Sequence, residues 1–158
     1  MASSDTYLTT EGLRALEEEL DNLRSVRRQE VADRIQDAKE VGDLESSEYE
    51  EAKKEQSFVE GRIQELETMI NNAIIIPDHS RGKKSSTVEL GSIVKVQPVA
   101  GKKAETYTIV GSTEASPADG RISNESPLGQ ALLGKSAGDE VQFTVPAGVQ
   151  RFKIVSVR

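Results

Sequence analysis

Apolar residues in the first half of the chain recur at helical spacing, and the pattern begins close to the N-terminus. The first series, with steps of 3, 4 and 3, comprises Leu13, Leu16, Leu20 and Leu23. Such spacing is typical of the buried face of a coiled-coil helix. Thr9 or Thr10 can cap this helix, and Glu11 follows in the first turn, near the positive end of the helix dipole. We therefore predict a helix that begins near residue 10.

The first series is interrupted and then resumes. Arg27 and Arg28 occupy the stretch where the next core position is due, and the series continues with Val31, Ile35 and Ala38. A break of this kind in a heptad pattern indicates a local change in helical winding.

A second series runs without interruption, in alternating steps of 4 and 3. It comprises Ala52, Gln56, Val59, Ile63, Leu66, Ile70 and Ala73. Two such faces joined by a short turn near residues 41–44 predict an antiparallel helical hairpin. Charged positions on the outer faces favour a hairpin that stands free rather than one covered along its length. Each arm of roughly 30 residues would be about 45 Å long.

The second half of the chain changes to strand-like patterns. Pro77 ends the helical pattern, because proline cannot continue a helix and disfavours helix in the residue before it. Short β-type runs follow at 92–96, 106–110, 140–145 and 150–157, which predict an antiparallel sheet. Ser126 and Pro127 can start a short helix between the second and third runs. We expect a hairpin at 1–76, a polar linker at 77–87 and a β-rich domain at 88–158, an α+β chain.

The charge is distributed unevenly. Residues 1–76 hold 19 acids and 9 bases, a net charge of −10, whereas residues 77–158 hold 8 acids and 11 bases, a net charge of +3. Duplex DNA is therefore not expected as a main partner of the hairpin, and a positively charged recess or a cation suits it better. The absence of cysteine and the single His79 exclude disulfides, thiol chemistry and a histidine metal cluster. Without an apolar span or a leader pattern, we expect a cytoplasmic protein.

Several segments, taken in order, resemble the GreA/GreB family along almost the whole chain. In the first half they are 8–12 (LTTEG), 42–44 (GDL) with Glu48 and Tyr49, and 60–63 (EGRI). In the second half they are 109–111 (IVG), 114–115 (EA), 122–123 (IS), 126–129 (SPLG), 131–135 (ALLGK) and 138–139 (GD). The resemblance implies an FKBP-like second domain.

The resemblance also implies a function. Members of this family bind bacterial RNA polymerase and insert the hairpin through its secondary channel. Acidic tip residues then stimulate cleavage of the 3′ end of backtracked RNA, which rescues arrested complexes. Such a protein is not an enzyme itself. It has no cofactor when free and shares Mg²⁺ with the polymerase, and it is expected to be a monomer that makes neither membrane nor sequence-specific DNA contacts.

The tip carries the residues that the resemblance assigns to this activity. Asp43 matches the tip Asp of the family, although an Asp in this place could also simply cap the second helix. The family's second carboxylate lies three positions after that Asp, where this chain has Ser46, and the segment before Tyr49 is one residue shorter. Glu45 is the expected substitute and Glu48 the alternative. Carboxylates are suitable Mg²⁺ ligands, so Asp43 and Glu45 are expected to bind the shared metal.

Further assignments follow from the same resemblance. Lys39 and Lys53 match basic positions that face the RNA, and they could equally be ordinary solvated lysines. Ser126, Pro127 and Leu128 match a segment that docks on the polymerase, and they could also be no more than a helix start. Tyr49 could stack on a base, whereas its place just below the tip favours packing between the arms.

Three alternatives remain at this point. A Gre-type antagonist would occupy the same channel and inhibit transcription or cleavage, which the shortened tip permits. A coiled-coil adaptor would have no use for the tip carboxylates. A prolyl isomerase in the second half is disfavoured, because an isomerase pocket is usually rich in aromatic residues. This half has only Tyr107, Phe143 and Phe152, and all three fall within predicted strands.

Overall fold

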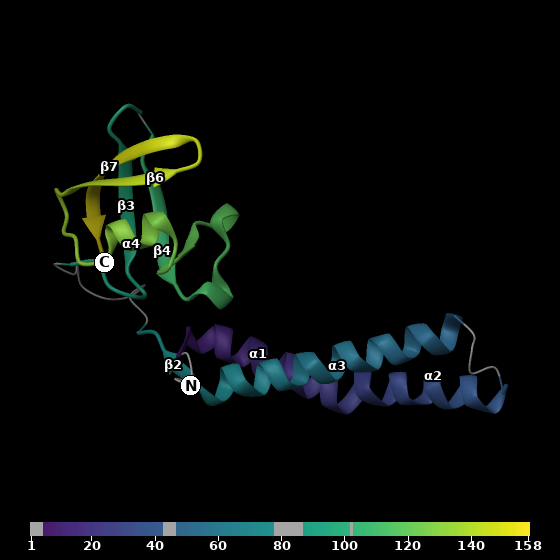
Figure 1. The fold of residues 1–158 in the computed structure, drawn as a ribbon. Helices are drawn as coiled ribbons and strands as arrows, with labels where there is room; N and C mark the ends of the chain where they lie inside the picture. Colours follow the sequence, from purple (N-terminus) through teal and green to yellow (C-terminus); the bar gives the residue numbers. More distant parts are fainter. Residues whose placement is uncertain (1–4, 43–46, 78–86, 102) are drawn as a thin grey trace. The chain divides into compact units, whose positions relative to one another are not determined.

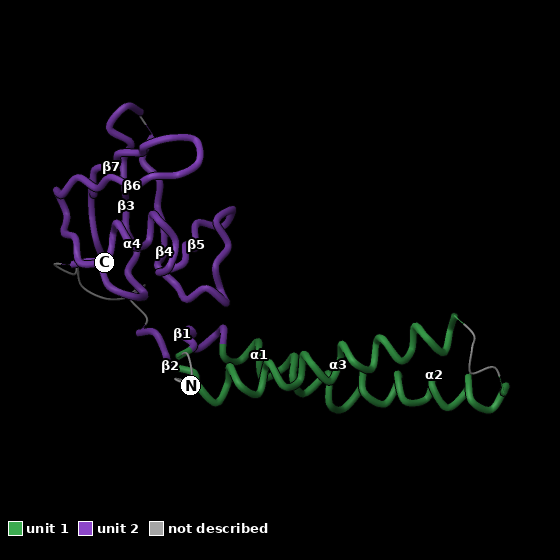
Figure 2. The backbone as a smooth tube through the Cα atoms, viewed as in Figure 1, with its two compact units in different colours: residues 1–5, 13–73 green, residues 6–12, 74–158 purple. Residues whose placement is uncertain are grey.

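The computed structural model of the chain describes residues 5–42, 47–77, 87–101 and 103–158. Its elements form two compact units (Figure 2). One contains residues 1–5 and 13–73, and the other contains residues 6–12 and 74–158. The boundaries predicted from the sequence, 1–76, 77–87 and 88–158, stay a prediction, and most of the expected linker lies outside the described residues. Within the described residues, no helix combines the length and apolarity needed to span a bilayer.

The first helical arm is built from three consecutive segments. Helix α1 (Thr10–Asn22) leads into a π-helical turn, η1 (Leu23–Arg27), and then into α2 (Arg28–Glu40). The π-helical turn lies where the heptad series is interrupted. One π-helical turn rotates the residues that follow around the helix axis, so the apolar face resumes on the same side at Val31. The expected change in winding is therefore present.

The second arm is the single helix α3 (Ser47–Asn71), which lies beside the first (Figure 1). Its 25 residues correspond to about 37 Å at 1.5 Å per residue. The two predicted apolar series meet between the arms. Their most buried members, each at most 8% exposed, are Leu16, Leu20, Val31, Ile35, Ala52, Val59, Ile63 and Leu66. The outward positions carry exposed charged side chains, as expected: Glu17, Glu18, Asp33, Asp37, Glu50, Glu51 and Lys54.

Two short strands were not expected. Strand β1 (Thr6–Leu8) pairs with β2 (Ala73–Ile75), and the amide of Ile76 donates to the carbonyl of Leu8 at 2.7 Å. The pattern of the second arm suggested helix up to Ile76, but α3 ends at Asn71. Consecutive isoleucines favour strand over helix, and Pro77 favours an extended residue before it.

The second unit contains a five-stranded sheet in the order β5-β4-β3-β7-β6. Its strands are β3 (Ile93–Pro98), β4 (Glu105–Val110), β5 (Arg121–Ser123), β6 (Glu140–Val145) and β7 (Gly148–Val157). The four expected strands are present and pair antiparallel. The sheet is nevertheless mixed, because β5 pairs parallel to β4. Two 3₁₀ turns, η2 (Ser112–Glu114) and η3 (Pro117–Asp119), carry the chain back so that β5 runs in the same direction as β4.

Helix α4 (Pro127–Leu132) lies against one face of this sheet (Figure 1). Leu132 is fully buried in a core shared with residues of β3, β4, β6 and β7. Two stacked rings, Phe143 and Phe152, extend this core with centroids 5.5 Å apart. The predicted fold class, a long helical hairpin followed by a small β-rich domain with a short helix, is confirmed.

Candidate functional site at the hairpin tip and its supports

The first arm ends where the sequence predicts the tip. Gly42 follows α2 with a φ of +78°, a conformation that costs glycine little and other residues more. Its amide donates to the carbonyl of Lys39 at 3.0 Å, which closes the last turn of the helix. The chain thus leaves α2 at Gly42, immediately before Asp43.

The two carboxylates expected to act at the tip, Asp43 and Glu45, lie outside the described residues, as does Ser46. The alternative carboxylate, Glu48, lies in the first turn of α3 and is exposed. A negative charge is favourable at this end of a helix because the first N–H groups are unpaired. Its role and that of the two tip acids stay predictions.

The two lysines expected near RNA are both exposed. Lys39 lies in the last turn of α2, where a positive charge complements the helix dipole. The Nζ atom of Lys53 lies 6.0 Å from the ring centroid of Tyr49, on the preceding turn of α3, at the outer limit of a cation–π contact. Tyr49 is half-buried, so the phenol ring partly packs and partly faces solvent.

Below the tip, ion pairs join the two arms, and the only sign of them in the sequence was the interruption of the apolar series by Arg27 and Arg28. Arg28 binds Glu60 with two nitrogens, at 2.8 and 3.0 Å, and Arg62 binds Glu19 in the same way, at 2.7 and 3.0 Å. Further pairs are Arg24–Glu67, Arg27–Glu55 and Arg34–Glu55. The hydrogen bond to Glu19 raises the pKa of the Arg62 guanidinium above its usual range.

These pairs explain why arginines interrupt the apolar series. Arg27 and Arg28 stand where a core residue was due, and each reaches across to a glutamate of α3. Exposed ion pairs contribute little to stability, on the order of 0.2–1 kcal/mol each. Their geometric effect is larger, because a bidentate pair at a fixed height favours one axial alignment of the arms. The two arms of the hairpin are therefore held in register over much of their length.

The segment expected to dock on the polymerase forms the start of α4. The hydroxyl of Ser126 accepts from the amide of Gly129 at 3.0 Å and donates to the carbonyl of Ser123 at 2.7 Å. Pro127 is exposed, whereas Leu128 packs partly against the core. The helix-start interpretation is confirmed, and the docking role stays a prediction in which Pro127 offers the most accessible surface.

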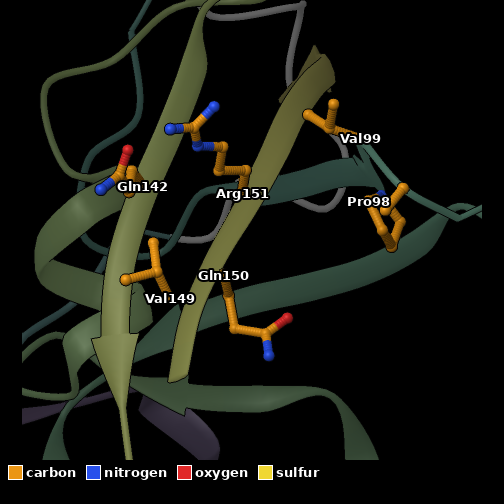
Figure 3. A pocket seen from close by; sticks show the side chains of 7 residues that line it. Pro98, Val99, Gln142, Val149, Gln150 and Arg151 are labelled. Atoms are coloured by element: carbon orange, nitrogen blue, oxygen red, sulfur yellow. The ribbon is translucent and has the colours of Figure 1, made fainter. Parts of the chain in front are cut away.

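A pocket of about 390 Å³ lies beside β6 and β7 (Figure 3). It is lined by Pro98, Val99, Ala100, Gln142, Val149, Gln150 and Arg151. These residues provide apolar surface, two amides and one guanidinium, and none of them is aromatic. We assign no chemistry to this pocket.

The chain was also compared with known proteins. The family model described as "Transcription elongation factor, N-terminal" matches residues 6–75, and the model "Transcription elongation factor, GreA/GreB, C-term" matches residues 83–158. Curated relatives named "Transcription elongation factor GreA" are 49% identical in Bacillus anthracis and 50% identical in Bacillus cytotoxicus, each covering 100% of both chains. A crystal structure of GreA factor homolog 1 (Gfh1) from Thermus thermophilus is 30% identical, covers 98% of this chain and 99% of its own, and superposes with a TM-score of 0.43.

Both halves of the chain thus match the same family, in the order and over the residue ranges that the hairpin and the β-rich domain occupy. The full-length identity of the curated relatives supports the assignment independently of any single motif. The chain belongs to the GreA/GreB family of transcription elongation factors.

Proposed function

We propose that this protein binds RNA polymerase in the cytoplasm, inserts its hairpin into the secondary channel and stimulates cleavage of the 3′ end of backtracked RNA. The observation that carries the proposal is the hairpin, whose arms bury their apolar faces against each other. Because each arm covers the other, about 37 Å of helix can reach into a narrow channel without exposing a hydrophobic surface. A hairpin of this kind can carry acidic residues to a distant reaction centre.

The expected chemistry belongs to the polymerase, with carboxylates supplied in trans. Asp43 and Glu45 are the proposed ligands, with Glu48 as the alternative to Glu45. Carboxylate oxygens suit Mg²⁺, and a second Mg²⁺ in a phosphoryl-transfer site supplies activation of the attacking water. The protein itself would orient these oxygens and hold them at the tip, and the exposed Lys39 and Lys53 would attract the RNA phosphates.

The test uses stalled elongation complexes that contain backtracked RNA labelled at the 5′ end. Added wild-type protein should shorten the RNA rapidly from its 3′ end. Altering an outer-shell partner of a bound metal typically costs about 10- to 100-fold in activity, so Asp43→Asn, which removes a proposed ligand, should cost at least that much. Asp21→Asn is the matched control. It makes the same charge change at an exposed position of α1, far from the tip.

The same assay identifies the second carboxylate. Whichever of Glu45→Gln and Glu48→Gln causes the larger loss marks that residue. Pro127→Ala should weaken polymerase binding and leave the cleavage rate at saturating protein unchanged. If the wild-type protein slows nucleotide addition without any cleavage, it is an antagonist and the proposal fails. If Asp43→Asn has no effect on an active protein, the tip carboxylate is not used.

A further inference from the structure

Glu114 is a nearly covered carboxylate in the unit formed by residues 6–12 and 74–158. Its side chain is 9% exposed. Oε2 accepts a hydrogen bond from the Thr9 amide at 2.6 Å, and Oε1 accepts one from the Thr9 hydroxyl at 2.6 Å. Arg121 of β5 donates to the same Oε1 atom at 2.8 Å. Burying a carboxylate is costly unless hydrogen-bond donors replace its water, and these three donors do so.

Thr9 connects this carboxylate to the first turn of α1. Its hydroxyl donates to Glu114 and accepts from the amide of Gly12 at 3.0 Å, which makes Thr9 the N-cap of the helix. Hydrogen bonds in such a chain strengthen one another. The negative charge of Glu114 also lies at the end of α1 where the helix dipole favours it. Glu114 thus holds the cap and the turn that follows.

Gly12 is the residue that lets the carboxylate approach. A Cβ atom at this position would lie 2.3 Å from Cδ of Glu114, and 2.4 and 2.7 Å from its two carboxylate oxygens. No side chain fits there while Glu114 keeps its place. Glycine is a poor helix former, so its presence inside the first turn has a packing reason. Glycine at position 12 therefore lowers the helical propensity of the first turn but allows the contact with Glu114.

We propose that Glu114 is a positioning residue of this factor, acting through Thr9 on the first turn of α1. From Leu13 onward the same helix belongs to the hairpin unit, whose arms lead to the tip. A helix that starts from a fixed turn delivers its far end with less conformational freedom, and geometric freedom at a reaction centre lowers the rate. The inference rests on the proposed function, since transcript cleavage is what the positioned tip would serve.

The first experiment separates cleavage from binding. Glu114→Gln keeps the size of the side chain, but an amide has one acceptor oxygen and cannot serve all three donors. We expect the cleavage rate at saturating protein to fall by about tenfold, while the protein concentration that half-saturates the polymerase stays within about twofold. Glu140→Gln, the same change at an exposed carboxylate of the same unit, should alter neither quantity. Wild-type cleavage by the Glu114→Gln protein, or a loss confined to binding, would overturn the inference.

The second experiment does not depend on cleavage. Because the chain contains no cysteine, Ser47→Cys at the start of α3 can carry a single photocrosslinker. In stalled complexes, its crosslinking yield to the RNA 3′ end reports delivery of the tip. We expect a lower yield with Glu114→Gln at equal polymerase occupancy. If the wild-type protein binds without cleaving, the proposed function fails while this yield still decides the inference, and an unchanged yield refutes it. A protein that does not bind polymerase refutes both.

Discussion

Replacing Gly12 with alanine provides a stability test in which two physical effects have opposite signs. Helix propensity by itself predicts that Gly12→Ala stabilises the first turn of α1, because alanine is more favourable than glycine by about 0.8–1.0 kcal/mol. Packing predicts the reverse. The new methyl group would lie 2.3 Å from Cδ of Glu114, so the carboxylate must move away.

The loss of stability in Gly12→Ala follows from the hydrogen bonds that break when the Glu114 carboxylate moves away. Both hydrogen bonds from Thr9 to Glu114 measure 2.6 Å, and bonds to a charged group contribute about 1.5–3 kcal/mol each. Thr9 is only half-buried, so water replaces part of this, and we take the loss as about 3 kcal/mol in total. With about 1 kcal/mol regained from propensity, the net destabilisation is about 2 kcal/mol, which corresponds to a roughly 30-fold larger equilibrium constant for opening of the turn.

Amide hydrogen exchange measures the stability of the first turn of α1 directly. A local measurement is needed because a chain of two units need not unfold in one step. Exchange at residues 9 and 12 should accelerate roughly 30-fold in Gly12→Ala. Gly61→Ala is the matched control, since Gly61 lies inside α3 and a Cβ there meets no atom within 4 Å. That change should slow exchange in the neighbouring part of α3. If Gly12→Ala also slows exchange, or if its effect is the same in a Glu114→Ala background, the packing argument is wrong.

Two other predictions concern the core of each unit. Leu66 is fully buried between the arms, so Leu66→Ala should destabilise the hairpin by about 2–5 kcal/mol and lower the denaturation midpoint measured by the helical circular dichroism signal. Gln64→Ala, at an exposed position of the same helix, is the control. An unchanged midpoint in Leu66→Ala would mean that the arms do not pack as described. Burial and then the hydrogen bond to Glu105 raise the pKa of Tyr107 to about 12 from an ordinary value of 10. The protonated phenol is favoured in the folded state, so its contribution to stability is complete below pH 10 and is lost as the pH rises towards 12. An alkaline absorbance titration at about 295 nm should show a phenol with a midpoint near 12 that disappears in Tyr107→Phe, and a titration unaltered by that change would refute the assignment.

Some parts of the fold were predictable from local pattern. The spacing of Leu16, Leu20 and Val31 specifies which face of the first arm is buried, because side chains three and four apart lie on one side of a helix. The break before Val31 was also visible, since a heptad series cannot skip a position without a change in winding. The start of α4 followed from Ser126 and Pro127, a cap and a first-turn residue whose preferences are local.

Other parts had no local signal. Strand β5 has three residues, too few for alternation to show. It forms because the two 3₁₀ turns that follow β4 bring it alongside the free edge of that strand. The strand at Ala73–Ile75 continued an apolar run that a helix could equally have used, and the pairing with β1, 65 or more residues earlier in the chain, decided the matter. At the tip, the sequence indicated candidate acids through a family resemblance. The structure adds the features that support the tip, namely the turn at Gly42 and the ion pairs between the two arms.

The sequence by itself determined the helical hairpin, its buried faces, the four longer strands and the family, because periodicity, capping and turn residues act over a few positions. Only the tertiary structure decided what stands opposite each face. Glu114 lies 105 positions from Thr9, and nothing in either segment specifies that the two meet. The contact exists because Gly12 leaves room for a carboxylate and because the fold brings η2 to the first turn of α1. Steric fit of this kind depends on all three coordinates of both partners, and a one-dimensional pattern does not contain them.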